Sequence, residues 1–395
     1  MSEPSVPRQR SLWRLFIAPV LLLVAAIAWS AFWFYAASRV DGQADAWQAR
    51  EAKSGRTYRC GDRSVGGFPF RLEVRCSDVG VALVSQTAGR DNTPITAQLG
   101  EILVVAQVYD PKHVIAEFKG PATIVDRSAQ STFVANWRIG RSSVVGLPGT
   151  PERASLVFDD ATINRADQPV PLPLASAQHV ELHGRIAEGS SPDSPMIESV
   201  LQINQGSIRG LHPMLAEPFD AGIRAMVSGL KDFSPKPWPL RFREIQAAGG
   251  HVEILQFRFQ QADLIATGKG TLGFSPSGHI EGELQMTVAG IEKVIPSLGI
   301  DRMLEDGVPQ ATLDQVAPGV KAQDVSKLMG ALDRALPGLG KVVKQNANAG
   351  VVAGVNALGK EAVLEGRKAR VFSLRFVDGV VFLGPLKVAQ TPPLF

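Results

Sequence analysis

An uncharged apolar run at residues 15–38 constrains this chain more than any other feature of its sequence. The run reads LFIAPVLLLVAAIAWSAFWFYAAS, and a helix of about 20 apolar residues is enough to cross the hydrocarbon core of a bilayer. Arginines at positions 8, 10 and 14 precede it, and such residues stay on the cytoplasmic side. We therefore expect a transmembrane anchor. The residues assigned to this anchor are Leu15, Trp29, Trp33 and Tyr35.

A cleaved signal peptide is the alternative interpretation of the same run. The small residues Ala36, Ala37 and Ser38 could form a cleavage site. However, the apolar part of a signal peptide is usually about 7–15 residues long, and this run is longer and ends in bulky aromatic residues. Under either interpretation the rest of the chain is exported. The short basic tail predicts a single-pass protein of the bacterial inner membrane, with its N-terminus in the cytoplasm and its main domain in the periplasm.

The spacing of apolar runs and turn residues predicts the fold class. After residue 57, short apolar runs alternate with glycine- and proline-containing turns every 8–15 residues or so, which is typical of antiparallel strands. Residues 240–247, 251–260 and 264–274 are among the segments expected to be strands. We predict a mainly β protein with a few helices: an elongated, curved antiparallel sheet, sandwich or open barrel-like domain behind the N-terminal transmembrane helix.

The same patterns predict six segments along the chain. They are a cytoplasmic tail (1–14), the anchor (15–38), a helical stalk (39–56), a β-rich periplasmic domain (57–299), a helical insertion (300–367) and a C-terminal β-hairpin that completes the sheet (368–395).

Cys60 and Cys76 are the only cysteines of the chain. Two cysteines of an exported protein form a disulfide by default. A redox site would need the spacing Cys-x-x-Cys, and a metal site would need further ligands nearby; neither is present in this stretch. If the two cysteines face each other across a hairpin, the turn falls at residues 67–69. The turn is assigned to Gly66, Gly67 and Pro69, and the core-facing side of the hairpin to Phe70, Leu72 and Val74.

This cysteine stretch also carries a resemblance to a known family. The stretch YRCGDRSVGGFPFRLEVRCSD follows a single span that contains SAFWFYAA. In this it resembles the bacterial domain-of-unknown-function family numbered 2125, whose members also pair a short N-terminal anchor with a Cys…GGFPFR…Cys element. The resemblance covers most of the chain and implies no particular activity.

A second, shorter resemblance lies in residues 262–299. The stretch GTLGFSPSGHIEGELQMTV is similar to the last repeats of AsmA-like envelope proteins. Those are long, curved β structures with an apolar interior, implicated in the movement of lipid across the envelope. Any curved antiparallel sheet could produce a likeness of this length.

An amphipathic helix is expected within the helical insertion. The stretch DVSKLMGALDRALPGLGKVV has apolar residues at helical spacing before a Pro-Gly break. These residues are Val325, Leu328, Met329, Leu332 and Leu336. Packing on the sheet is the favoured interpretation, and contact with a membrane or a lid over a groove are the alternatives.

Motifs for catalysis and cofactor binding are weak in this sequence. Gly268, Gly270 and Gly273 match a dinucleotide-binding fingerprint, but an expected strand runs through them where a helix should begin. Gly359-Lys360 ends a near match to a phosphate-binding loop that lacks the required Ser or Thr. We therefore expect no cofactor and no catalytic residues.

His179 and His183 could share one face of a strand, with Glu181 between them. No third ligand completes a convincing metal site, so we expect solvated strand residues and no bound metal. The net charge of +3 is too small to indicate nucleic-acid binding.

These observations favour one function over two alternatives. The favoured hypothesis is a membrane-anchored periplasmic protein that binds or shields an apolar ligand, such as a lipid, in maintenance of the cell envelope. The first alternative is a structural or scaffolding protein that binds other envelope proteins. The second, less favoured, is a hydrolase of envelope material, because paired carboxylates can lie far apart in sequence.

Overall fold

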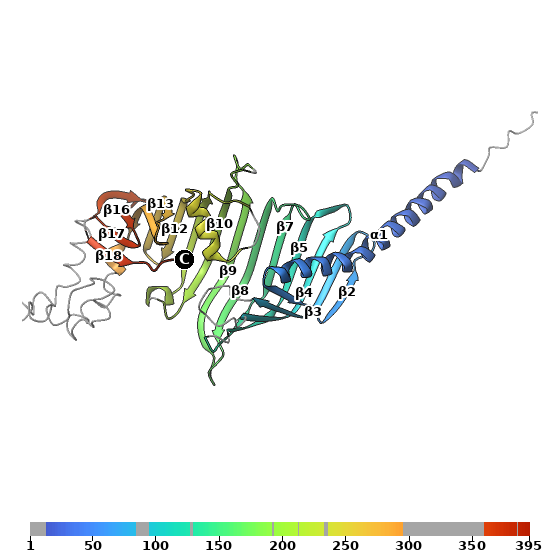
Figure 1. Cartoon of the computed structure of the whole chain (residues 1–395), viewed down its shortest axis with the longest axis horizontal. Coiled ribbons are helices and arrows are strands. Elements are labelled where there is room, and N and C mark those ends of the chain that lie inside the picture. Colours follow the sequence, from blue (N-terminus) through green and yellow to red (C-terminus); the bar gives the residue numbers. More distant parts are fainter. Residues whose placement is uncertain are drawn as a thin grey trace, which may run out of the picture.

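The protein is built around one long antiparallel β-sheet, with a long helix at the N-terminal end (Figure 1). The computed structural model describes residues 13–83, 95–126, 129–191, 193–211, 213–232, 236–294, 359–384 and 386–395. The helices are α1 (Trp13–Lys53), the 3-10 helix η1 (Pro213–Ala216), α2 (Trp238–Ala247) and α3 (Ile291–Val294). The amphipathic helix predicted around Val325–Leu336 lies outside the described residues.

Eighteen strands of the described residues belong to this sheet. They are β1 (Arg56–Arg59), β2 (Asp62–Gly66), β3 (Arg71–Leu83), β4 (Ile95–Gln107), β5 (Asp110–Asp126), β6 (Ser131–Asn136), β7 (Ile139–Val145), β8 (Arg153–Arg165), β9 (Leu172–Ile186), β10 (Ile197–Ile208), β11 (Phe219–Val227), β12 (Val252–Gln261), β13 (Leu264–Phe274), β14 (Ile280–Ala289), β15 (Lys360–Leu364), β16 (Arg367–Val377), β17 (Val380–Leu383) and β18 (Leu386–Gln390).

The sheet is open at both ends. Each strand pairs mainly with its neighbours in sequence, and every pairing between the described strands is antiparallel. The strands β1 and β2 both pair with β3 and form one end, while β18 pairs with β17 and forms the other. The prediction of an elongated antiparallel sheet is therefore confirmed, in the form of a single open sheet and not of a sandwich or closed barrel.

Helix α1 has a free part and a part that lies on the sheet. The side chains of residues 16–28 are all exposed. From Trp29 onward, less exposed side chains recur at helical spacing where α1 contacts β1 and β2. They include Trp29, Trp33, Val40, Ala44, Gln48 and Glu51. The helix runs to Lys53 without interruption, so the predicted anchor and stalk are two parts of one helix.

One face of the sheet is apolar along almost its whole length. A row of directly opposite residues crosses thirteen successive strands, and only Ser142 within it is polar. With neighbouring strands about 4.8 Å apart, this apolar row is on the order of 60 Å long. The row is Val65, Val74, Val104, Ala116, Ser142, Leu156, Leu182, Leu201, Ile223, Phe257, Gly268, Met286 and Phe372. We call the face that carries it the apolar face, and the opposite face the polar face.

The apolar face is covered at its C-terminal end and uncovered in the middle. On this face, Phe242 of α2 lies 5.2 Å from Phe274 between ring centroids, and the strand residues Leu264, Ala266 and Phe372 are 7%, 7% and 5% exposed. By contrast, no apolar side chain of the strands β4 to β9 is buried. In this central part of the sheet a row of Val, Leu and Phe side chains therefore lies against no second layer among the described residues.

The prediction of a strand at residues 240–247 is wrong, because this segment is helix α2. The apolar residues Leu240 and Phe242 alternate as in a strand, but Ile245 follows three positions after Phe242, as on a helix face. Phe242 contacts Phe274 of the sheet at 5.2 Å between ring centroids. The buried Glu244 accepts hydrogen bonds from the Lys231 backbone and the Lys236 side chain, which tie the preceding loop to α2.

Candidate membrane-proximal and lipid-contact site

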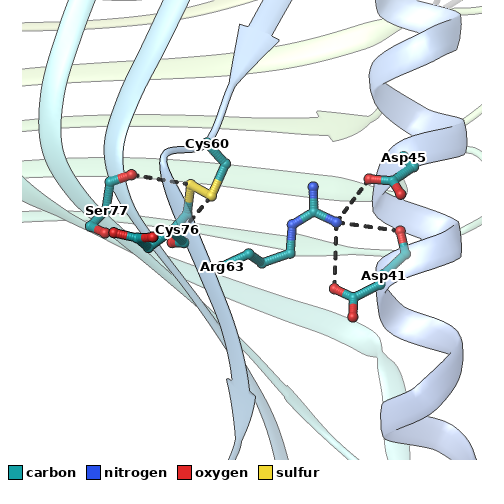
Figure 2. Close-up of a disulfide and its surroundings, with 7 residues drawn as sticks. Asp41, Asp45, Cys60, Arg63, Cys76 and Ser77 are labelled. Atoms are coloured by element: carbon teal, nitrogen blue, oxygen red, sulfur yellow. Dashed lines mark hydrogen bonds and ion pairs between the residues drawn. A yellow bond between two sulfur atoms is a disulfide. The ribbon is translucent and has the colours of Figure 1, made fainter.

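The first hairpin of the sheet carries the disulfide between Cys60 and Cys76 (Figure 2). Their Cα atoms are 5.6 Å apart, and 16 positions separate them in sequence. The predicted register, with the two cysteines directly opposite, is wrong: Cys76 lies opposite Arg63. The pairing is displaced by three residues because the turn is wider than expected, with the Arg71 amide donating to the Gly67 carbonyl at 3.0 Å.

This wider turn changes the role of three predicted hairpin residues. Gly66 pairs with Glu73 as the last residue of β2, so only Gly67 and Pro69 of the predicted turn residues lie in the turn. Phe70 was expected to face the core but is 60% exposed, because it belongs to the turn and not to β3. Leu72 and Val74 are half-buried, and Val74 is part of the apolar row.

Arg63 joins this hairpin to α1 on the apolar face (Figure 2). Its guanidinium lies 2.9 Å from Asp45 Oδ1 and 3.4 Å from Asp41 Oδ1. Arg63 and Val65 are two positions apart on β2, so they share a face of the strand. The segment of α1 around Asp41 and Asp45 is thus held on the face that carries the apolar row.

Trp29 and Trp33 of α1 contact the tip of the hairpin, residues 67–70. We call this contact the aromatic junction. The indole N–H of Trp29 donates to the Pro69 carbonyl at 2.8 Å, and that of Trp33 donates to the Arg71 carbonyl at 2.7 Å. The Phe68 ring lies 5.4 Å from Trp33, which is 5% exposed. Two of the predicted anchor residues therefore contact the sheet, while Tyr35 is exposed and stays beside Arg39.

The polar face is crossed by ion pairs between neighbouring strands. Glu198 accepts hydrogen bonds from Arg224 and Arg185, and these bonds lower the pKa of Glu198 below its usual value. His179 lies 2.7 Å from Asp159, and this hydrogen bond raises the pKa of the imidazole.

The histidine pair that was considered as a metal site is engaged in such pairs. His183 lies 2.6 Å from Glu181, and His179 lies 3.5 Å from the same carboxylate. Within the described part of the chain, no group of three His, Cys, Asp or Glu side chains could hold a metal ion. The His179–Asp159 contact joins β9 to β8, whereas the two contacts with Glu181 lie along β9 itself.

A family of bacterial proteins matches this chain over residues 33–392. It is described as an uncharacterized protein conserved in bacteria, DUF2125. The chain belongs to the DUF2125 family. The match confirms the family expected from the cysteine stretch, and it covers Trp33, the hairpin and the sheet.

Other comparisons add little to this DUF2125 protein. No curated protein matches the chain. The likeness to AsmA-like proteins rests on the strands β13 and β14 and their turn, and the family match does not extend to those proteins.

One cluster that sequence reasoning missed joins residues far apart in this DUF2125 chain. The Ser275 hydroxyl donates to Asp378 Oδ1 at 2.8 Å, and Ser277 Oγ lies 2.9 Å from His279 Nδ1. His279 Nδ1 also lies 3.4 Å from Asp378 Oδ1. A catalytic triad needs the serine and the carboxylate on different ring nitrogens, whereas both share Nδ1 here. The cluster therefore ties the β13–β14 turn to the β16–β17 turn.

Proposed function

We propose that this DUF2125 protein is a single-pass protein of the bacterial inner membrane whose periplasmic sheet binds lipid acyl chains on its apolar face, in maintenance of the cell envelope. The observation that carries the proposal is the apolar row, which crosses thirteen strands and has no second layer over its centre among the described residues.

The uncovered apolar side chains support a lipid ligand. Large exposed apolar surfaces on a folded protein mark sites that contact a membrane, a partner or an apolar ligand. In the centre of the row, Leu182 is 43% exposed and lies between Leu156 and Leu201 on the neighbouring strands. Aliphatic side chains in a continuous row match the chemistry of an acyl chain, which offers no hydrogen bonds to a polar groove.

The position of α1 supports a membrane as the source of that lipid. Among the described helices, α1 alone is long and apolar enough to cross a membrane. It lies against the β1 and β2 end of the sheet, and the sheet extends from there in the opposite direction to the free part of α1 (Figure 1). Because Arg63 holds α1 on the apolar face, an acyl chain beside the helix would meet the first residues of the apolar row.

The charge and the disulfide support the orientation. Arg8, Arg10 and Arg14 precede the apolar run, which favours a cytoplasmic N-terminus. The sheet then lies in the periplasm, where a disulfide such as Cys60–Cys76 is stable.

We also propose that the protein acts by binding and not by catalysis. The cluster of Ser277, His279 and Asp378 supports this, because the hydroxyl and the carboxylate share one imidazole nitrogen. The ion pairs of His179 and His183 support it too, since both histidines are paired with carboxylates.

Lipid analysis of two matched variants tests the binding proposal. The full-length protein is purified from membranes in mild detergent, and co-purified phospholipid is measured by mass spectrometry. Leu182→Lys places a charge on the apolar face, and Gln202→Lys places the same charge on the polar face of the next strand, opposite Glu181. We expect Leu182→Lys to lose most of the bound lipid and Gln202→Lys to keep it.

Three outcomes would contradict the proposal. The unaltered protein could carry no phospholipid, or the two variants could lose it equally. Reproducible crosslinks to one envelope protein, in the absence of bound lipid, would instead favour the scaffolding alternative.

A further inference from the structure

We propose that the tip of the β2–β3 hairpin and the adjacent β4–β5 turn form a membrane-contact surface, with Phe68, Phe70 and Tyr109 in the interface of the bilayer that α1 crosses. The proposal rests on the membrane anchoring by α1 proposed above. It adds that the sheet is held against the lipid surface by its own residues and is not merely tethered to it.

Three large aromatic side chains gather at this edge of the sheet without cover. Phe68, Phe70 and Tyr109 are 51%, 60% and 66% exposed. Tyr109 belongs to the β4–β5 turn, and the amide of the preceding residue, Val108, donates to the Phe70 carbonyl at 3.0 Å, so the two turns are adjacent. Aromatic side chains are favoured at the level of lipid headgroups, where one side is apolar and the other is wet.

The length of α1 places this tip at the level of the bilayer. The part of α1 that the sheet leaves free, residues 16–28, is about 20 Å long at 1.5 Å per residue. The hydrocarbon core of a bilayer is about 30 Å thick. The missing ~10 Å, or about seven residues, has to come from Trp29 onward, where the hairpin tip already lies beside the helix.

The arginines at the two ends of the apolar run make any other position of α1 along the bilayer normal unfavourable. A shift of α1 toward the periplasm would bring Arg14 into the hydrocarbon core, where an arginine is unfavourable. A shift the other way would bring Arg39 closer to it. The exposed Arg71 side chain directly follows Phe70 and lies 3.2 Å from Glu73 Oε1, and a guanidinium at that level can also pair with lipid phosphate.

Four backbone carbonyls at and beside the tip are hydrogen-bonded within the protein, as a membrane environment requires. Unpaired carbonyl groups are costly near hydrocarbon. The Pro69 and Arg71 carbonyls accept hydrogen bonds from the indoles of Trp29 and Trp33. The Gly67 and Phe70 carbonyls accept from backbone amides. The tip thus presents aromatic rings outward while these four carbonyls are paired.

Hydroxyl-radical footprinting of the unaltered full-length protein tests this placement. The protein is reconstituted into vesicles of phosphatidylethanolamine and phosphatidylglycerol, and side-chain oxidation is read by mass spectrometry. We expect Phe68, Phe70 and Tyr109 to be protected like Leu23 in the free part of α1. Trp238 is 71% exposed on α2 and should be oxidised strongly.

The same experiment separates the two ways in which the idea can fail. If Leu23 is protected while Phe70 and Tyr109 are oxidised as fast as Trp238, the tip lies in water and this inference is wrong, although α1 is inserted. If Leu23 is oxidised as well, α1 does not cross the vesicle membrane, and the proposed anchoring fails with it.

Photocrosslinking gives an independent readout at the tip. Benzoylphenylalanine in place of Phe70 should form an adduct with phospholipid on irradiation in these vesicles. Leu211 is 73% exposed in the turn after β10, at the opposite edge of the sheet, and the same group there should form none. Equal adducts at both positions, or none at Phe70, would overturn the proposal.

Discussion

Removing the disulfide should loosen one end of the sheet and leave the rest unchanged. The strand β2 has five residues and, among the described strands, pairs only with β3, so it depends largely on that single ladder and on the covalent bridge. Cys60 and Cys76 are 16 positions apart. On the chain-entropy model, closing a loop of this size contributes about 3 kcal/mol. The double variant Cys60→Ser/Cys76→Ser should lose about this much of the local stability.

Hydrogen–deuterium exchange is the suitable assay, because an open sheet can unfold locally at one end. A loss of about 3 kcal/mol corresponds to roughly 100-fold faster exchange of the amides that open with the hairpin. We expect this acceleration in peptides that cover β1 and β2. Peptides that cover β13 and β14, at a distance along the sheet, serve as the internal control and should not change.

Three results would refute this reasoning. Exchange in β1 and β2 could change by less than about threefold, which would mean that α1 and the ladder to β3 hold the hairpin without the bridge. Alternatively, the whole sheet could exchange faster, which would mean that the end strands unfold together with the rest. Free labelling of Cys60 and Cys76 by a thiol reagent in the unreduced, denatured protein would show that the bridge does not form at all.

Three further predictions concern ion pairs and close backbone packing. Arg224 and Arg185 lower the pKa of Glu198 below 4.5, so its stabilising effect is present above that pH and is lost as the pH falls through the lower, folded-state pKa. Because both arginines are about half exposed, Glu198→Gln should lower the free energy of unfolding by about 1 kcal/mol, as measured by urea unfolding at neutral pH. It should also weaken the dependence of stability on pH on the acid side. An unchanged dependence on pH would contradict this prediction. Gly270→Ala should destabilise the protein by about 2 kcal/mol or more, because a Cβ would collide with the Glu283 backbone. A Cβ at Gly273 would meet its neighbours only at ordinary contact distance, so Gly273→Ala should cost under about 1 kcal/mol. Equal effects of the two variants on the melting temperature would be inconsistent with the structure. A double-mutant cycle of Arg63→Ala and Asp45→Ala should give a coupling energy of about 0.5–1 kcal/mol in unfolding, and additive effects would show that this pair does not hold α1.

Much of this molecule followed from local chemistry that can be read along the chain. The uncharged run before Arg39 needs no partner to be recognised as a long apolar helix. Alternating apolar and polar residues on β9, such as Val180, Glu181 and Leu182, indicate a strand with one apolar face, whatever it pairs with. The cysteine stretch identified the family in the same way, because its residues are contiguous.

Errors arose where two local patterns competed. In α2, Leu240 and Phe242 satisfy a strand pattern, and only the packing of Phe242 and Ile245 on the sheet selects the helix. In the first hairpin, the assumption that bonded cysteines lie directly opposite gave the wrong register. The wider turn takes up Phe70, which is why this residue was placed in the core and lies exposed, whereas Leu72 and Val74 stay in β3.

The features that suggest function depend on residues that only the tertiary structure brings together. The chain itself determines that it has a long apolar helix, strands with one apolar side and two cysteines, because each is a property of neighbouring residues. Folding decides that the apolar sides of thirteen strands align in one row, that Trp29 meets Pro69 across 40 positions, and that Ser275 meets Asp378 across 103. Register and turn width set these contacts, and both depend on the free energy of the whole sheet.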